Sequence, residues 1–281
     1  MSVSEHEPSR PAAPPAGGPG DAADIVFSGA QVRYPNGTVG LADVDLTIPA
    51  GQMVTVVGLS GAGKSTLVRS INGLVRLTGG DVTVGGRSVV HARGAQLRAL
   101  RAQIGMIFQN FNLVTRTSVL NNVLMGRLHD VATWRTLLGA YPPADVESAL
   151  RALERVEIVQ KAYDRASELS GGQQQRVAIA RALAQEPRVL LADEPVASLD
   201  PPTSHVVMRD LQRINRELGI TVVVNLHFLD LARSYGDRLI GMRAGRVVFD
   251  GTAAQADEAV FADIYGRSLT ADDVMVGEPG L

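Results

Sequence analysis

Residues 58–66 read GLSGAGKST and are the part of the sequence best suited to hold a triphosphate. They match the pattern G-x-x-x-x-G-K-[ST], with Gly58, Gly63, Lys64 and Ser65 at its fixed positions. Glycines let backbone N–H groups approach phosphate oxygens without a Cβ atom in the way. Lys64 is then expected to reach the β- and γ-phosphates, and the Ser65 hydroxyl to bind Mg²⁺. An ordinary glycine-rich turn is the alternative, but a strand-like run precedes this loop and helical spacing follows it, as a phosphate loop requires.

Two carboxylates, Asp193 and Glu194, follow the apolar run RVLLA, which is typical of a buried strand. Buried parallel strands in α/β folds place their ligands just beyond their carboxyl ends. Asp193 is suited to holding Mg²⁺ through water, and Glu194 to orienting or deprotonating an attacking water. Adjacent acids after a strand are also a common loop feature, but here a phosphate loop supplies the partner that they need. The pattern therefore predicts hydrolysis of a nucleotide.

A second arrangement suited to anions lies in the run LSGGQQQR, residues 169–176, which precedes the helical pattern VAIARALA. Ser170 is an N-cap-type residue, and Gly171 and Gly172 would open the helix N-terminus toward a phosphate. A single domain has no obvious need for two phosphate cradles. One explanation is that the second cradle serves the nucleotide held by another copy of the protein.

Four further residues allow two interpretations each when they are read alone. Tyr34, at the end of a strand-like run, either stacks on a nucleobase or packs against the fold. Gln109 and His227, which each end a strand-like run, are surface or structural residues, or polar contacts to the nucleotide site. Trp134 belongs to the core or contacts a partner protein. Only further evidence separates these alternatives.

Composition narrows the classes of function. The chain has 281 residues, of which 45% are apolar and 20% charged, as is usual for a globular protein. Its formal charge of −2 argues against nucleic acid as the main ligand. Its apolar runs are too short to cross a bilayer, so a membrane role requires a partner. The sequence has no cysteine, which excludes disulfides and thiolate metal sites and fits a cytoplasmic protein.

The chain divides into three expected segments. Residues 1–23 are rich in proline, alanine and glycine and are predicted to be a disordered tail without the pattern of a signal peptide. Residues 24–266 alternate strand and helix patterns, with a helical region at about 110–170. Residues 267–281 are expected to form a C-terminal tail.

The order of these motifs resembles that of the nucleotide-binding subunit of ATP-binding cassette (ABC) transporters. The resemblance covers residues 24–266 and rests on GLSGAGKST, the Gln109 loop, LSGGQQQR, LLADEP, SLD and the His227 loop. It implies an α/β fold: a P-loop NTPase cassette with a RecA-like core, an antiparallel β subdomain and an α-helical subdomain. It also implies a head-to-tail homodimer, in which ATP lies between residues 58–66 of one copy and residues 170–173 of the other.

The resemblance also assigns roles to individual residues. Tyr34 would stack on adenine, and Glu194 would act as the catalytic base. His227 would sense the γ-phosphate, Asp200 would cross the dimer, and Gln109 would couple Mg²⁺ and water to the membrane subunits. The implied nucleotide contacts are Tyr34, Gly58, Ser60, Gly61, Ala62, Gly63, Lys64, Ser65, Thr66, Ser170, Gly171, Gly172, Gln173 and Asp200. The implied catalytic residues are Glu194, His227 and Gln109, and the implied ligands of Mg²⁺ are Ser65, Gln109 and Asp193.

Within that family the chain is most similar to the ATP-binding subunits of phosphonate importers. The similarity lies in FNLVTRTSVLNNVLMGRL, TWRTLLG and GITVVVNLHFLDLA. It implies ATP and Mg²⁺ as cofactors, an integral membrane permease and an extracytoplasmic phosphonate-binding protein as partners, and no nucleic acid. It also implies a peripheral position on the cytoplasmic side of the cell membrane. Phe228, where glutamine is common, and the proline-rich tail depart from the pattern without touching the hydrolysis residues.

Two alternatives remain at this stage. The cargo could be phosphate, phosphite or another oxyanion, because the ATP-binding subunit does not itself hold the cargo. The chain could also be a soluble ABC-type accessory ATPase of phosphonate metabolism. DNA-repair relatives usually carry long coiled coils and translation factors usually carry two cassettes, and the sequence shows neither feature.

Overall fold

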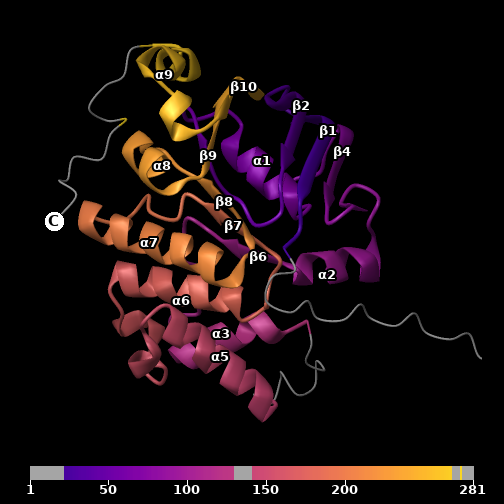
Figure 1. Ribbon diagram of the computed structural model, residues 1–281. Coiled ribbons are helices and arrows are strands. Elements are labelled where there is room, and N and C mark those ends of the chain that lie inside the picture. The colour runs from indigo at the N-terminus through magenta and orange to yellow at the C-terminus, as the bar shows by residue number, and fades with distance from the viewer. Residues whose placement is uncertain (1–21, 130–140, 268–272, 274–281) are drawn as a thin grey trace, which may run out of the picture.

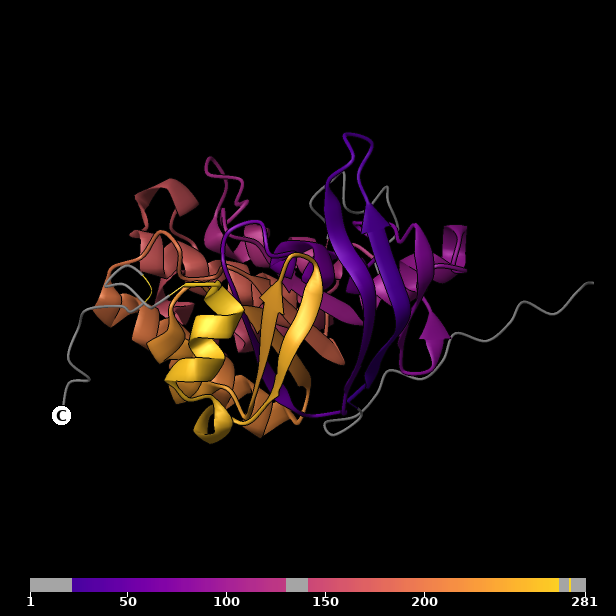
Figure 2. The ribbon, with the colours of Figure 1, turned by 90° about the horizontal axis from the view of Figure 1, so that it is seen from above.

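The computed structural model describes residues 22–129, 141–267 and 273. Their strands form two sheets, with the helices packed around them (Figures 1 and 2). One sheet has six strands in the order β10-β9-β3-β8-β7-β6, and the other has four in the order β2-β1-β4-β5. The tail predicted for residues 1–23 lies outside the described residues except for its last two. Of these, Ala23 is buried, so the folded part includes it.

The six-stranded sheet forms the centre of the molecule. Its strands are β3 (Met53–Val57), β6 (Ile104–Ile107), β7 (Val189–Asp193), β8 (Thr221–Asn225), β9 (Arg238–Arg243) and β10 (Arg246–Gly251). All pairings are parallel except that of β9 with β10. Every residue of β3, β7 and β8 is buried, as expected for continuous β-branched and apolar runs covered on both faces. Parallel pairing brings the carboxyl ends of these three strands to one edge.

The four-stranded sheet is antiparallel and packs beside the first (Figure 2). Its strands are β1 (Ile25–Arg33), β2 (Val39–Ile48), β4 (Gly79–Val84) and β5 (Arg87–Ser88). Helix α1 (Lys64–Ile71) lies between the two sheets, because Leu67, Val68 and Ile71 share one buried cluster with apolar residues of both. The helix that begins within the phosphate loop is therefore fixed from two sides.

The helices cover the central sheet and build a separate layer at one end (Figure 1). They are α2 (Gly94–Ala102), α3 (Val119–Leu124), α5 (Pro143–Arg155), α6 (Gly171–Leu183), α7 (Pro201–Leu218), α8 (Leu229–Tyr235) and α9 (Glu258–Tyr265). Short 3₁₀ turns lie at Met125–Arg127, Val159–Lys161, Ala166–Glu168 and Ala253–Gln255. Helices α3, α5 and α6 pack on one another through the larger apolar cluster. Of these three helices, α3 and α5 lie within residues 110–170, and α6 begins directly after that range.

The structure differs from the sequence-based expectation at the end of β8. We expected this strand to continue to His227, but it ends at Asn225. Its neighbour β7 stops pairing at Asp193, and Glu194 takes a positive φ of 54°, which turns the chain away and leaves residues beyond Asn225 without a ladder on that side. His227 therefore stands in a loop, followed by α8, a helix that the sequence pattern did not indicate. Trp134 lies outside the described residues.

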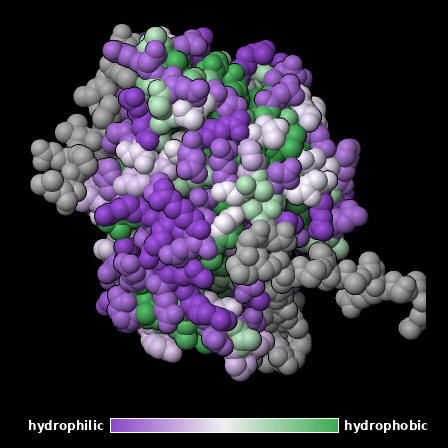
Figure 3. Space-filling view, viewed as in Figure 1, coloured by the Kyte–Doolittle hydropathy of each residue, from purple (hydrophilic) through white to green (hydrophobic). Residues whose placement is uncertain are grey.

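The hydropathy of the surface differs between regions. Hydrophilic side chains gather over α6 and α7 in the view of Figure 3. Among the described residues, no helix combines the length and the apolar character needed to cross a membrane.

Candidate functional site

The loop between β3 and α1 has a shape that only glycine allows at two positions. Gly58 and Gly63 have φ angles of 145° and 105°. A Cβ atom on Gly58 would lie 2.2 Å from the Met242 carbonyl oxygen, and one on Gly63 would lie 2.4 Å from the Gly40 carbonyl oxygen. The glycines of the phosphate-loop pattern are therefore required by the packing of this loop against its neighbours.

Lys64 places a buried cation at the loop. Its Nζ atom donates to the carbonyl oxygens of Gly58, at 2.7 Å, and Leu59, at 3.1 Å. Burial lowers the pKa of the ammonium, while the charges of Glu194 and Asp193 act in the opposite direction. The amine is thus held by two loop carbonyls, in a position where a bound polyphosphate would supply stronger, charged acceptors.

Four side chains from three elements form a hydrogen-bonded chain at the edge of the sheet. The Asn225 amide nitrogen donates to Asp193 Oδ1 at 2.7 Å and to Ser65 Oγ at 3.1 Å. Arg69 donates from Nε to Asp193 Oδ2 at 2.7 Å. The predicted pair Ser65 and Asp193 is therefore joined through an amide. Asn225 and Arg69 were missed by the sequence analysis, although an amide inside the apolar run VVVNLH was a usable signal.

Glu194 and His227 form a close pair at the same edge. The distance between His227 Nε2 and Glu194 Oε1 is 2.7 Å. The hydrogen bond from His227 lowers the pKa of Glu194, burial opposes this, and the charges of His227, Lys64 and Arg69 lower it further. Glu194 is consequently a carboxylate at neutral pH, as a group that accepts a proton from water must be.

The side chains predicted to bind Mg²⁺ offer the oxygen atoms that this ion prefers. Ser65 and Asp193 lie together, and Asn225 Oδ1 is buried beside them with no hydrogen-bond partner among the described residues. The third predicted ligand, Gln109, is exposed on the loop after β6 and has no hydrogen bond to either. The donor set fits a hard cation, with Gln109 outside the group that the structure brings together.

Tyr34 lies beside the start of α1. Its hydroxyl is 3.0 Å from Thr66 Oγ1, and its half-buried ring packs against the cluster between the sheets. Glycine at position 40 makes room for this ring, because a Cβ atom there would lie 2.9 Å from both Tyr34 and Thr66. The buried part of the Tyr34 ring therefore packs against the fold, as one of the two interpretations expected. The stacking of its exposed part on adenine stays a prediction.

The second cradle lies at the N-terminus of α6. Ser170 and Gln173 form a capping box: the Ser170 hydroxyl accepts from the Gln173 N–H at 3.4 Å, and the Gln173 side-chain oxygen accepts from the Ser170 N–H at 3.0 Å. A cavity of about 520 Å³ adjoins them. Its described lining combines residues 170–173 and 176 with residues 198–200, 202, 203, 206 and 207. Among them is Asp200, which caps α7 by accepting from the Thr203 N–H.

Among the described residues, none that lines this cavity belongs to the phosphate loop. Within one chain, the two predicted cradles therefore form separate sites. This separation fits an arrangement in which each cradle is completed by another copy.

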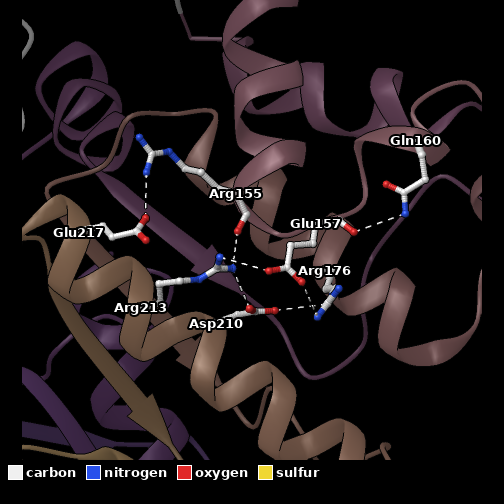
Figure 4. A network of polar contacts seen from close by, with 7 residues as sticks. All are labelled: Arg155, Glu157, Gln160, Arg176, Asp210, Arg213 and Glu217. Carbon is white, nitrogen blue, oxygen red and sulfur yellow. Dashed lines mark hydrogen bonds and ion pairs between the residues drawn. The ribbon is translucent and has the colours of Figure 1, made fainter.

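An ion-pair network lies behind the second cradle, between α5, α6 and α7 (Figure 4). Asp210 on α7 is at its centre, with 8% of its side chain exposed. Arg213 donates from Nη2 to Asp210 Oδ1 at 2.9 Å. The Nε atom of Arg176 on α6 lies 3.3 Å from Asp210 Oδ2, without the geometry of a hydrogen bond. A carboxylate oxygen of Glu157 lies 3.4 Å from Arg213 Nη1, and the other lies 3.8 Å from Arg176 Nη2. Charges of opposite sign thus fix α6 against α7.

Comparison with known proteins gives consistent results. The sequence pattern of the ABC transporter family matches residues 41–197. The chain is 57% identical over 254 residues to "Phosphonates import ATP-binding protein PhnC 3" of Halalkalibacterium halodurans, covering 90% of this chain and 98% of that protein. It is 61% identical over 251 residues to "Phosphonates import ATP-binding protein PhnC" of Shouchella clausii, covering 89% of this chain and 94% of that protein.

Solved structures agree with this result. The dimeric ATP-binding cassette MJ0796, bound to ADP and Pi in a post-hydrolysis state, is 34% identical, with a TM-score of 0.72 over 82% of this chain and 98% of that one. The cbiO1 protein of Clostridium perfringens, part of an ABC transporter complex, is 30% identical, with a TM-score of 0.73 over 85% of this chain and 90% of that one. The predicted cassette fold is confirmed. The chain belongs to the ABC transporter family, and within it to the phosphonates import ATP-binding proteins.

Proposed function

We propose that this chain hydrolyses ATP and thereby drives the import of phosphonate through a membrane permease. The observation that carries the proposal is the meeting of Lys64, Asp193 and the Glu194–His227 pair at one edge of the central sheet. A cation for the phosphates, an acid for the metal and an ionised base for water are the parts that phosphoryl transfer to water needs.

In this mechanism Lys64 leaves the carbonyl oxygens of its own loop and binds the β- and γ-phosphates. Glu194 orients a water molecule and accepts its proton as the water oxygen bonds to the γ-phosphorus, whose bond to the bridging oxygen breaks so that ADP leaves. His227 holds the carboxylate in place and donates toward the γ-phosphate. Ser65 and Asp193 would hold Mg²⁺, with Gln109 as the further ligand that the resemblance implies, and the bound ion would offset negative charge on the phosphate oxygens.

The site is completed by a second copy in this proposal. Residues 170–173 of one copy would face the ATP held by residues 58–66 of the other, with Asp200 crossing between them and Tyr34 stacking on adenine. Closure of this dimer depends on contacts that only ATP provides, so hydrolysis reopens it. A permease would receive the motion through the helical region after Gln109, on the cytoplasmic side of the membrane.

The cargo is proposed from the relatives, whose names specify phosphonates import. A phosphonate-binding protein outside the membrane would deliver the cargo to the permease. Phosphate, phosphite and a soluble accessory role are the alternatives that an experiment has to separate.

The test is ATPase activity of the chain assembled with its permease in lipid vesicles. The binding protein is added empty, loaded with a phosphonate, or loaded with phosphate. We expect stimulation by the phosphonate-loaded form alone. Equal stimulation by the phosphate-loaded form would contradict the cargo, and an activity that is independent of the permease would contradict the transport role.

A further inference from the structure

Arg69 is a charged residue at the site that neither the motifs nor the mechanism uses. It lies in the last turn of α1, four residues after Ser65, so the two side chains project from the same face of the helix. Its Nε atom is 2.7 Å from Asp193 Oδ2. The Asp193 side chain is 1% exposed, whereas that of Arg69 is 43% exposed. The arginine thus reaches from solvent to a buried acid.

Both oxygens of Asp193 are occupied in this arrangement. Oδ1 accepts from Asn225, and Oδ2 accepts from Arg69. A buried carboxylate requires a charged partner or a metal ion, and a guanidinium is always protonated. The acid predicted to hold Mg²⁺ is therefore neutralised by the protein's own cation.

The acids at this edge already face cations of the protein itself. The charges of Lys64 and Arg69 act on Glu194, and those of Glu194 and Asp193 act on Lys64. A divalent ion that approaches Asp193 alone meets the guanidinium at contact distance from the same carboxylate. A nucleotide triphosphate brings several negative charges and its own oxygen ligands, which offset that repulsion.

We propose that Arg69 is a positioning residue that serves as the internal counter-ion of Asp193, and that it makes divalent-metal binding depend on bound nucleotide. In the nucleotide-free protein it holds the carboxylate and opposes a lone cation. With ATP present, its exposed side chain leaves Oδ2 toward solvent and releases the acid for the metal. This proposal rests on the proposed ATPase function, because it concerns the metal of the same site.

The test compares Arg69→Met with the wild type and with Arg69→Lys, which keeps the charge. Arg87→Met is the matched control, since Arg87 is an exposed arginine on β5 in the other sheet. Mn²⁺ is titrated into nucleotide-free protein and followed by electron paramagnetic resonance. We expect Arg69→Met to bind Mn²⁺ about tenfold more tightly than the wild type, because one charge near the ligand is removed and solvent screens part of its effect. Arg69→Lys and Arg87→Met should stay near the wild-type affinity.

A purely structural ion pair gives a different result. In that case Arg69→Met lowers the melting temperature and leaves the Mn²⁺ affinity unchanged, which would overturn the proposal. If Arg69→Met does not fold, Arg69→Gln replaces it. This variant also removes the charge but can still donate to Asp193 Oδ2, and its Mn²⁺ affinity is compared with that of the wild type. Binding of a fluorescent ATP analogue without metal is measured in parallel. If the wild type does not bind the analogue, the proposed function fails, and this outcome is distinct from an unchanged Mn²⁺ affinity.

Discussion

At the scale of single residues, the chemistry depends on where Glu194 is held. Its backbone has a φ of 54°, which turns the side chain out of the strand direction just after β7 ends. There it meets His227 at 2.7 Å, near the positive charges of Lys64 and Arg69. One residue earlier, Asp193 is bound by Asn225 and Arg69. Two adjacent acids thus have separate partners and separate proposed tasks.

The pair of Glu194 with His227 predicts a pH-dependent stability. Because the folded-state pKa of Glu194 lies below its ordinary value of 4.5, its ionised form stabilises the folded protein. This contribution is present above pH 4.5 and is lost as the pH falls through the folded-state pKa. Chemical denaturation of the wild type and Glu194→Gln between pH 3 and 6 should show a wild-type advantage that disappears in acid. A difference that does not change with pH would contradict this account.

The phosphate loop predicts a steric effect at Gly58. Alanine there would place its Cβ atom 2.2 Å from the Met242 carbonyl oxygen, so Gly58→Ala should lower the free energy of unfolding by about 2–4 kcal/mol. Gly37→Ala is the matched control, because Gly37 also has a positive φ, of 84°, but its Cβ atom would meet nothing within 4 Å. The control should cost about 1–2 kcal/mol. Equal losses in urea denaturation would show that packing at Gly58 is not the constraint.

At the scale of elements, the sequence predicts those strands, loops and helix starts that depend on a continuous stretch of residues. Buried strands, the turn of the phosphate loop and the start of α6 are local patterns that the sequence indicates, but β6 and β8 end at Ile107 and Asn225, two residues before the expected Gln109 and His227. The contact of Arg69 with Asp193 was not predicted, because it joins residues 124 positions apart and depends on how α1 packs against β7. The end of β8 at Asn225 was not predicted either, since it follows from where its neighbour β7 turns away.

The network between α5, α6 and α7 predicts a large local contribution to stability. Asp210 is buried; burial raises its pKa, and the charges of Arg176 and Arg213 lower it. Asp210→Ala should lower the free energy of unfolding by about 3 kcal/mol, because it removes the buried acid between Arg176 and Arg213 and leaves them only the more exposed Glu157 as an acidic partner. The control is Arg151→Ala, which breaks an exposed pair with Glu147 and should cost less than about 0.5 kcal/mol. Similar values for both would contradict the role of the network.

At the scale of the whole molecule, the two predicted phosphate cradles of one chain lie apart. The described lining of the cavity at α6 contains no residue of the phosphate loop. The similar cassette MJ0796 is a dimer bound to ADP and Pi. A head-to-tail pair of copies accounts for both cradles with one arrangement.

This arrangement predicts the effect of blocking the second cradle. Ser170→Arg fills the cavity at α6 and leaves residues 58–66 intact. The variant should still bind a fluorescent ATP analogue with wild-type affinity and lose hydrolysis by about 100-fold or more, in line with removal of a group that acts in the transition state. Ser148→Arg, at a half-buried position of α5 outside both cradles, is the control and should hydrolyse ATP normally. Full activity of Ser170→Arg would show that the second cradle does not serve the reaction.

The most direct test of the account is the fate of ATP bound to Glu194→Gln assembled with its permease in lipid. The substitution keeps the size of the side chain and removes its capacity to accept a proton from water. We predict that the complex retains radiolabelled nucleotide as unhydrolysed ATP, while the wild type releases ADP and phosphate. Release of ADP and phosphate by Glu194→Gln at the wild-type rate would contradict the assignment of Glu194 as the base and, with it, the proposed mechanism.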